Sequence, residues 1–82
     1  MVIVAYGPAF EKRMRKMKDA SLMRRVKSQI RKIVDQPEIG KPMRHDRRGT
    51  REVYVKPFRL SYAYLGEEDK IIFLDFYHKD EQ

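Results

Sequence analysis

The sequence predicts an α+β fold with the element order β-α-α-β-β-β, in which a largely antiparallel sheet carries a helical hairpin on one face. Three observations lead to this prediction. Apolar residues recur at helical spacing between residues 8 and 35, the period changes to two after residue 50, and turn-forming residues separate the segments. With 82 residues, the chain has the length of one domain, which we assign to residues 1–82.

The N-terminal segment predicts a short strand followed by a helix. Residues 2–6 are mostly β-branched or aromatic, and Gly7 and Pro8 follow them directly. Pro8 suits the first turn of a helix, where its missing N–H costs nothing. The apolar stripe of this helix consists of Phe10, Met14 and Met17.

A second helix is predicted after a break at residues 19–21. Ser21 is the expected N-cap, since a serine hydroxyl can accept a hydrogen bond from the first turn. The helix ends before Pro37, because a residue that precedes proline avoids the α region. Its apolar stripe consists of Leu22, Val26, Ile30 and Ile33 or Val34.

The second half of the chain predicts three strands. Residues 37–49 contain two prolines and two glycines among polar residues, which indicates a loop with at most a short extended piece. Val53 and Val55 then alternate with polar residues, and Lys56-Pro57 indicates a tight turn. Residues 58–64 alternate again, residues 66–69 form the hairpin loop, and residues 70–77 form the last strand.

The net charge of +7 is unevenly distributed along the chain. Residues 1–48 hold fourteen lysines and arginines against five acids, whereas residues 49–82 hold five against seven. This excess of positive charge in one half indicates a polyanionic partner, either nucleic acid or an acidic protein segment.

The composition gives no indication of a metal, a cofactor or a membrane. The chain has no cysteine, and its two histidines, His45 and His78, are too far apart to suggest a metal site by themselves. No stretch approaches the roughly 20 apolar residues that span a bilayer. We therefore expect a cytoplasmic protein without metal or cofactor.

Four segments, taken in order, resemble the RelE/ParE superfamily of toxins from type II toxin–antitoxin systems. A Lys/Arg-rich helical hairpin follows Phe10, as at the start of these toxins. Residues 37–42 (PEIGKP) resemble the family's NP..GKP stretch, and residues 58–62 (FRLSY) resemble its YRLxY strand. Residues 76–79 (FYHK) resemble its terminal xHR motif.

The resemblance implies an mRNA endonuclease that acts in the ribosomal decoding site. Such a toxin cleaves without metal, by attack of the RNA 2′-hydroxyl on the adjacent phosphorus. It also implies a cognate antitoxin with an acidic segment that wraps the toxin, and contact with operator DNA only through that antitoxin.

Arg59 is the predicted cation of this chemistry. It alternates with Phe58 and Leu60, so its side chain is expected on the sheet face opposite the core. A guanidinium matches two phosphate oxygens at once, and in the family this arginine is catalytic. The alternative is a surface arginine paired with an acid such as Asp75.

The resemblance leaves two candidates for proton transfer. Lys79 lies where many RelE toxins have a catalytic arginine, whereas YoeB-like relatives use a histidine that matches His78, whose ordinary pKa suits neutral pH. We expect Arg59, Lys79 and His78 to meet at one end of the sheet. For RNA binding we predict Arg51, Lys56 and Tyr77, while Tyr62 is expected in the core.

Two departures from the family leave other functions open. Met43 stands where YoeB-like members have a glutamate base, and Lys79 replaces an arginine. A ParE-like toxin that inhibits DNA gyrase without cutting RNA is one alternative. A non-toxic RNA- or ribosome-binding protein is the other.

Overall fold

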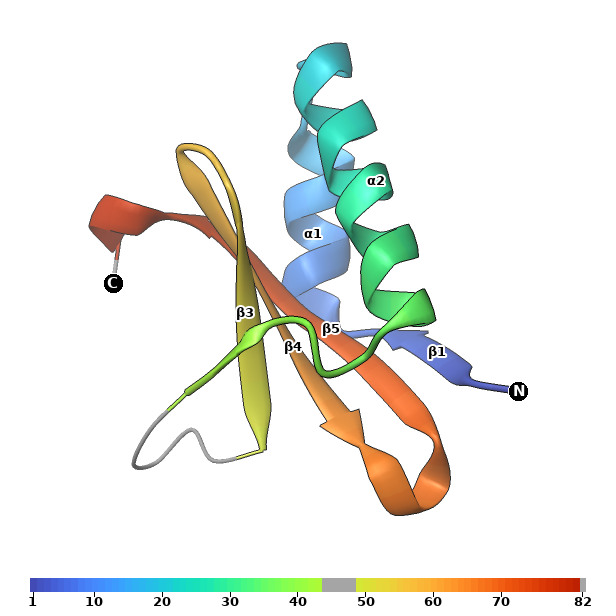
Figure 1. The fold of residues 1–82 in the computed structure, drawn as a ribbon. Coiled ribbons are helices and arrows are strands. Elements are labelled where there is room, and N and C mark those ends of the chain that lie inside the picture. Colours follow the sequence, from blue (N-terminus) through green and yellow to red (C-terminus); the bar gives the residue numbers. More distant parts are fainter. Residues whose placement is uncertain (44–48, 82) are drawn as a thin grey trace.

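A mixed sheet with two helices on one face forms the architecture. In a computed structural model, which describes residues 1–43 and 49–81, five strands follow the order β1-β5-β4-β3-β2. They are β1 (Ile3–Tyr6), β2 (Lys41–Pro42), β3 (Thr50–Val55), β4 (Phe58–Leu65) and β5 (Lys70–His78). The helices α1 (Pro8–Lys16) and α2 (Ala20–Asp35) lie side by side against the sheet (Figure 1). The predicted fold class and helical hairpin are confirmed.

The sheet is antiparallel except at one edge. β1 pairs in parallel with β5, and the remaining neighbours pair antiparallel. β1 therefore lies beside the last strand of the chain, and α1 and α2 form part of the crossover that a parallel pair needs. The short extended piece predicted within residues 37–49 is the edge strand β2. His45 and the basic residues around it lie outside the described residues.

The start of α2 differs from the prediction. Asp19, and not Ser21, is the N-cap: its carboxylate accepts a hydrogen bond from the Leu22 N–H at 3.0 Å. Ser21 already lies within the first helical turn. A carboxylate at this position also interacts favourably with the helix dipole, which a serine hydroxyl does not do to the same extent. At the start of α1, Pro8 occupies the first turn as predicted.

The core lies between the helices and the inner face of the sheet, by which we mean the face toward α1 and α2. The predicted stripes supply it, with Met14, Met17, Ile30 and Val34 partly buried at its margin. Its fully or almost fully buried members are Phe10, Leu22, Val26, Ile33, Val55, Leu60, Tyr62, Ile71, Phe73 and Phe76. The expectation that Tyr62 is a core residue is confirmed.

The opposite, outer face of the sheet is where the candidate site lies. Directly paired residues share a face, and Arg59 on β4 pairs with Tyr54 on β3 and with Tyr77 on β5. Glu52 pairs with Ser61 on the same face. The alternation therefore separates these residues from Leu60 and Tyr62, which pack toward the helices.

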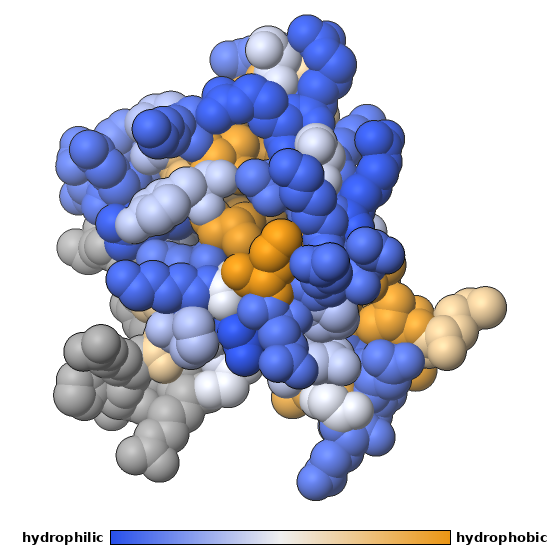
Figure 2. Space-filling view, in the orientation of Figure 1, coloured by the Kyte–Doolittle hydropathy of each residue, from blue (hydrophilic) through white to orange (hydrophobic). Residues whose placement is uncertain are grey.

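Within the described residues, no helix is long and apolar enough to cross a membrane. Figure 2 shows that hydrophilic side chains dominate the helical part of the visible surface, with apolar atoms confined to patches between them.

Candidate functional site

Three of the predicted site residues line one surface pocket at an end of the sheet. The turn at Lys56-Pro57 joins β3 to β4, and the end of β5 lies beside it because β4 and β5 are antiparallel. The Lys79 N–H donates to the Pro57 carbonyl at 3.2 Å, which holds the residue after β5 at this turn. The pocket has a volume of about 450 Å³ and is lined by Tyr54, Lys56, Pro57, Phe58, Arg59 and Lys79.

Arg59 is held in a defined position in this pocket. Its Nη1 donates to Glu52 Oε1 at 3.2 Å, and its Cζ lies 5.1 Å from the centre of the Tyr54 ring. The side chain is 21% exposed, so the guanidinium is partly shielded from water while still reaching the pocket. Arg59 is thus paired with an acid, as in the alternative interpretation, but the acid is Glu52 and not Asp75. Asp75 lies 3.6 Å from Arg13 instead.

Glu52 is a central residue of the site that the sequence did not reveal. It is 8% exposed, and it is the one charged residue that is buried within the described part of the chain. Its Oε2 accepts a hydrogen bond from the Tyr77 hydroxyl at 2.6 Å, while Oε1 accepts from Arg59. The alternation in residues 51–56 placed it on the polar face of a strand, but could not show that Arg59 from β4 and Tyr77 from β5 bind it there.

The aromatic residues divide between the site and the core. Tyr77 lies on the outer face, where its hydroxyl donates to Glu52 Oε2, and it does not line the pocket. Tyr54, which the sequence analysis did not single out, is 57% exposed and contributes its ring to the pocket wall. A large aromatic residue between two valines, on the polar side of the alternation, was the available signal for it.

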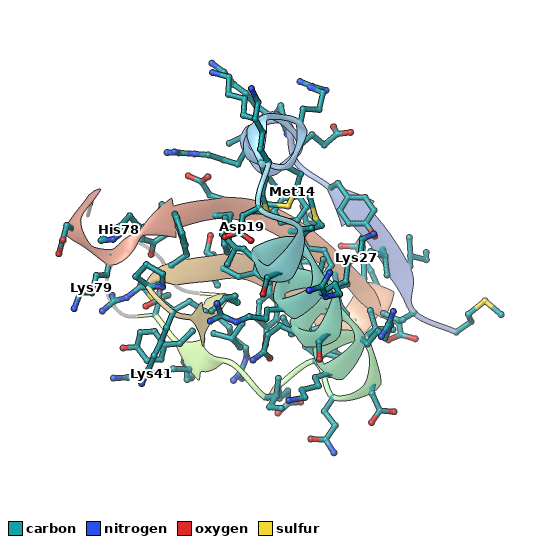
Figure 3. The ribbon with its side chains drawn as sticks, turned by 90° about the horizontal axis from the view of Figure 1, so that it is seen from above. Met14, Asp19, Lys27, Lys41, His78 and Lys79 are labelled. Carbon is teal, nitrogen blue, oxygen red and sulfur yellow. The ribbon has the colours of Figure 1, made fainter. Side chains whose placement is uncertain are left out.

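His78 does not share the outer face with Arg59. It pairs directly with Phe58, whose ring it contacts edge-on at 5.5 Å between centroids, on the side of the sheet that faces the helices. Its Nδ1 accepts a hydrogen bond from the Asp80 N–H at 3.2 Å. His78 and Lys79 are neighbours at the end of β5 (Figure 3), but only Lys79 lines the pocket.

Arg51 also lies away from the pocket. It pairs with Tyr62, and hence points to the inner face. Its Nη1 donates to the carbonyls of Glu38 and Gly40 at 3.0 and 2.9 Å. Arg51 thereby holds the segment that leads into β2, whereas Lys56 is exposed at the rim of the pocket.

Tyr62 holds the same segment from within the core. Its hydroxyl donates to the Pro37 carbonyl at 2.8 Å and accepts from the Gly40 N–H at 2.9 Å. A Cβ on Gly40 would lie 2.6 Å from that hydroxyl, so glycine is required for this close approach. Burial raises the pKa of Tyr62 above its ordinary value of 10.0, although the Gly40 hydrogen bond and the charge of Arg51 oppose the shift.

Comparison with models of known protein families identifies the family of this chain. The family model of the ParE toxin of the type II toxin–antitoxin system parDE matches residues 4–82. The chain belongs to this toxin family. The resemblance seen in the sequence is thereby confirmed, and the protein is a toxin of a type II toxin–antitoxin system. No curated protein sequence matches it.

Solved structures with the same fold include toxins with and without their antitoxins. The toxin matches the intact Escherichia coli RelBE complex with a TM-score of 0.80 and 12% identity, over 95% of this chain and 96% of that chain. It matches the RelBE2 complex from Mycobacterium tuberculosis with a TM-score of 0.79 and 22% identity, over 95% of this chain and 98% of that chain. It matches the YoeB/ParE toxin from Agrobacterium tumefaciens with a TM-score of 0.78 and 16% identity, over 94% of this chain and 98% of that chain.

The charge of the toxin is concentrated in its helical layer. Residues 8–35, which comprise α1, α2 and their connection, hold ten lysines and arginines against three acids. Their balance of +7 equals the net charge of the whole chain, and all ten basic residues are exposed.

Within the described residues, 1–43 and 49–81, no three histidine, aspartate or glutamate side chains lie close enough together to hold a metal ion.

Proposed function

We propose that this toxin is a ribosome-dependent mRNA endonuclease that inhibits translation by cutting mRNA in the decoding site. The observation that supports this function is the convergence of Lys56 and Arg59, from the β3–β4 hairpin, and Lys79, from the end of β5, on one pocket. Three cations beside an exposed aromatic ring suit a phosphodiester and the base attached to it.

In the proposed reaction, the RNA 2′-oxygen forms a bond to the adjacent phosphorus, and the bond from phosphorus to the 5′-oxygen breaks. The products are a 2′,3′-cyclic phosphate and a free 5′-hydroxyl. The proton of the 2′-hydroxyl leaves to a base, and the departing 5′-oxygen takes up a proton. No metal is needed for this balance, and proton transfer in either direction contributes about 10²–10⁴ in rate.

The pocket residues have distinct parts in this proposal. Arg59 binds the non-bridging oxygens, where negative charge increases in the transition state. Lys79 lies on the same pocket and protonates or stabilises the leaving oxygen, while Lys56 binds a neighbouring phosphate. Tyr54 provides a surface on which a base stacks, a contact worth about 1–3 kcal/mol.

The geometry favours Lys79 over His78 for proton transfer. Lys79 lines the pocket, whereas the His78 ring lies against Phe58 on the inner side of the sheet. Of the predicted RNA-binding residues, Lys56 remains in that role. In this proposal Tyr77 acts on the site indirectly, through its hydrogen bond to Glu52. Arg51 acts indirectly as well, because it holds the segment that leads into β2.

A second candidate function is a ParE-like toxin that inhibits DNA gyrase without cutting RNA. The specific observation in its favour is the carboxylate of Glu52, which already neutralises Arg59. The family match to ParE favours it as well.

The proposed partner is a cognate antitoxin that covers the toxin with an acidic, partly helical segment. A groove of about 380 Å³ between α1 and α2 has an apolar floor and basic residues at its rim. It is lined by Tyr6, Phe10, Met14, Met23, Val26, Lys27, Ile30 and Arg31. Apolar side chains flanked by acids complement this groove. As the proposed target is the ribosome, we place the toxin in the cytoplasm.

A toeprint assay on translating ribosomes tests the function. The purified toxin is expected to produce new 3′ boundaries within the decoding site, and Lys79→Ala is expected to weaken them more than His78→Ala. A gyrase supercoiling assay runs in parallel with the same preparation. Unaffected mRNA together with inhibited gyrase would move the assignment to the second candidate.

A further inference from the structure

Glu52 is an anomaly in a site proposed to bind phosphate. A carboxylate repels the substrate, and it costs several kcal/mol to bury unless it is paired and hydrogen-bonded. Nevertheless Glu52 is 8% exposed and lies next to the arginine that is proposed to bind the phosphate. A solvated residue with no part in the site would not have these properties.

The contacts of Glu52 join all three central strands of the outer face. Glu52 lies on β3, Arg59 on β4 and Tyr77 on β5. Its two oxygens bind different partners, Oε1 the Arg59 guanidinium and Oε2 the Tyr77 hydroxyl. Ser61, which pairs with Glu52, has a side chain small enough for Tyr77 to reach across β4. Glu52 therefore restrains two neighbouring side chains with a single carboxylate.

We propose that Glu52 is the positioning residue of the site: it fixes Arg59 in the orientation that serves the transition state, at the expense of affinity for RNA. This inference rests on the proposed nuclease function. Its physical basis is that a charged hydrogen-bond network holds a long side chain in one rotamer. Preorganised charge stabilises a transition state without the cost of reorganisation during the reaction.

The two effects of Glu52 have opposite signs and can be measured separately. As a negative charge, it weakens binding of any polyanion to the pocket, including an RNA that cannot be cut. As a hydrogen-bond acceptor, it raises the rate of the chemical step through the placement of Arg59. A residue with only a structural role changes the melting temperature, but does not tighten binding and slow cleavage at once.

Glu52→Gln is the variant that tests this inference. It keeps a side-chain oxygen of the same reach and removes the charge. We expect its kcat for ribosome-bound mRNA to fall on the order of 10–100-fold, as for a misplaced catalytic group. We expect its Kd for an all-2′-O-methyl RNA oligonucleotide to tighten by about 3–10-fold, as one repulsive charge near the phosphate is lost. Equal kcat and Kd in the variant and the parent would overturn the inference.

Two further variants separate charge from geometry. Tyr77→Phe retains the carboxylate but removes one of its hydrogen bonds, so kcat is expected to fall by about 3–10-fold with Kd unchanged. Glu67→Gln removes an exposed acid in the loop between β4 and β5, and is expected to leave both constants as in the parent. If Tyr77→Phe has the kcat of the parent, the network does not position Arg59.

The binding measurement with the 2′-O-methyl oligonucleotide distinguishes failure of this inference from failure of the proposed function. If the parent toxin cuts no mRNA, the nuclease assignment fails, whatever the variants do. Glu52→Gln then still has to bind the 2′-O-methyl oligonucleotide more tightly than the parent. Unchanged binding in that case would show that Glu52 does not face the nucleic acid, and the inference would be lost as well.

Discussion

Both catalysis and stability are expected to depend on Arg59, because its guanidinium faces the pocket and also compensates the buried charge of Glu52. Arg59→Ala is expected to slow mRNA cleavage by about 10²–10³, which corresponds to the loss of one preorganised donor. Arg59→Lys should recover only part of this rate, since a point charge does not hold two phosphate oxygens. Single-turnover cleavage on ribosomes measures both.

The same substitution should also lower the free energy of unfolding. Removal of Arg59 leaves the Glu52 carboxylate without its cation, at a cost of about 1–3 kcal/mol for this partly shielded pair. A thermal melt of Arg59→Ala beside the double variant with Glu52→Gln tests this point. The double variant should regain stability but not cleavage. A folded Arg59→Ala protein that cuts mRNA at the parental rate would refute the role of Arg59.

Tyr62 makes the stability of the toxin sensitive to alkaline pH. Its folded pKa is raised, chiefly by burial, so the unfolded chain loses the phenolic proton first. The contribution of Tyr62 to stability is therefore complete below about pH 10 and declines as the pH rises above that value, by at most about 1.4 kcal/mol per pH unit.

Chemical denaturation between pH 9 and 11.5 checks this dependence. Tyr62→Phe should show a shallower decline than the parent over this range. At neutral pH the variant should be less stable by about 1–3 kcal/mol, because the buried Gly40 N–H loses its acceptor. Parallel pH profiles for the parent and Tyr62→Phe would show that the hydroxyl does not account for the alkaline sensitivity.

At the level of single elements, α2 depends on its cap. Asp19→Ala removes the acceptor for the Leu22 N–H, and is expected to lower the free energy of unfolding by about 1 kcal/mol. Ser21→Ala, at the position that the sequence suggested as the cap, should change it by less than about 0.5 kcal/mol. Urea denaturation of the two variants under one set of conditions distinguishes them. A larger effect at Ser21 would contradict the observed cap.

The strands determine which side chains meet in the site. Because β4 pairs with both β3 and β5, Arg59 has one neighbour on each side, Tyr54 and Tyr77. The register shift between Ser61 and Tyr62 lies immediately beside this cluster. A bulge changes the direction of side chains along a strand, and bulges are frequent beside active sites.

For the whole molecule, the two faces have different electrostatic character. The helical layer carries the entire net charge, while the pocket on the other face combines three cations with one buried acid. If the toxin contacts about five phosphates of a single-stranded RNA, its affinity for that RNA should fall by about 100-fold between roughly 50 and 200 mM salt. A fluorescence anisotropy titration with single-stranded RNA measures this slope.

Charge removal on α1 tests whether the helical layer contributes to that slope. Replacement of Lys12, Arg15 and Lys16 by glutamine should reduce the slope of log K against log salt by about 2, if each contacts one phosphate. Lys70→Gln, at the end of β5 remote from Lys79, is the matched control and should leave the slope nearly unchanged. A slope that stays the same in the triple variant would assign the helical charge to solvent or to the antitoxin.

Local patterns in the sequence were sufficient to predict the helices and strands and to predict which face of each is buried. The spacing of Val26 and Ile33 predicted the buried side of α2, and the alternation around Leu60 placed Arg59 on the opposite face of its strand. Pro8, Pro37 and the Lys56-Pro57 turn marked where elements begin and end. These features follow from backbone geometry within a few residues, so the chain determines them locally.

Only the tertiary structure decided which residues meet across the strands. The pairing of β4 with both neighbours brought Glu52 to Arg59 and Tyr77, put His78 against Phe58, and turned Arg51 toward the segment before β2. The choice of Asp19 over Ser21 as the cap likewise depended on where α2 starts. Register and burial arise from contacts between residues far apart in the chain, and a one-residue difference in register reverses which face a side chain occupies.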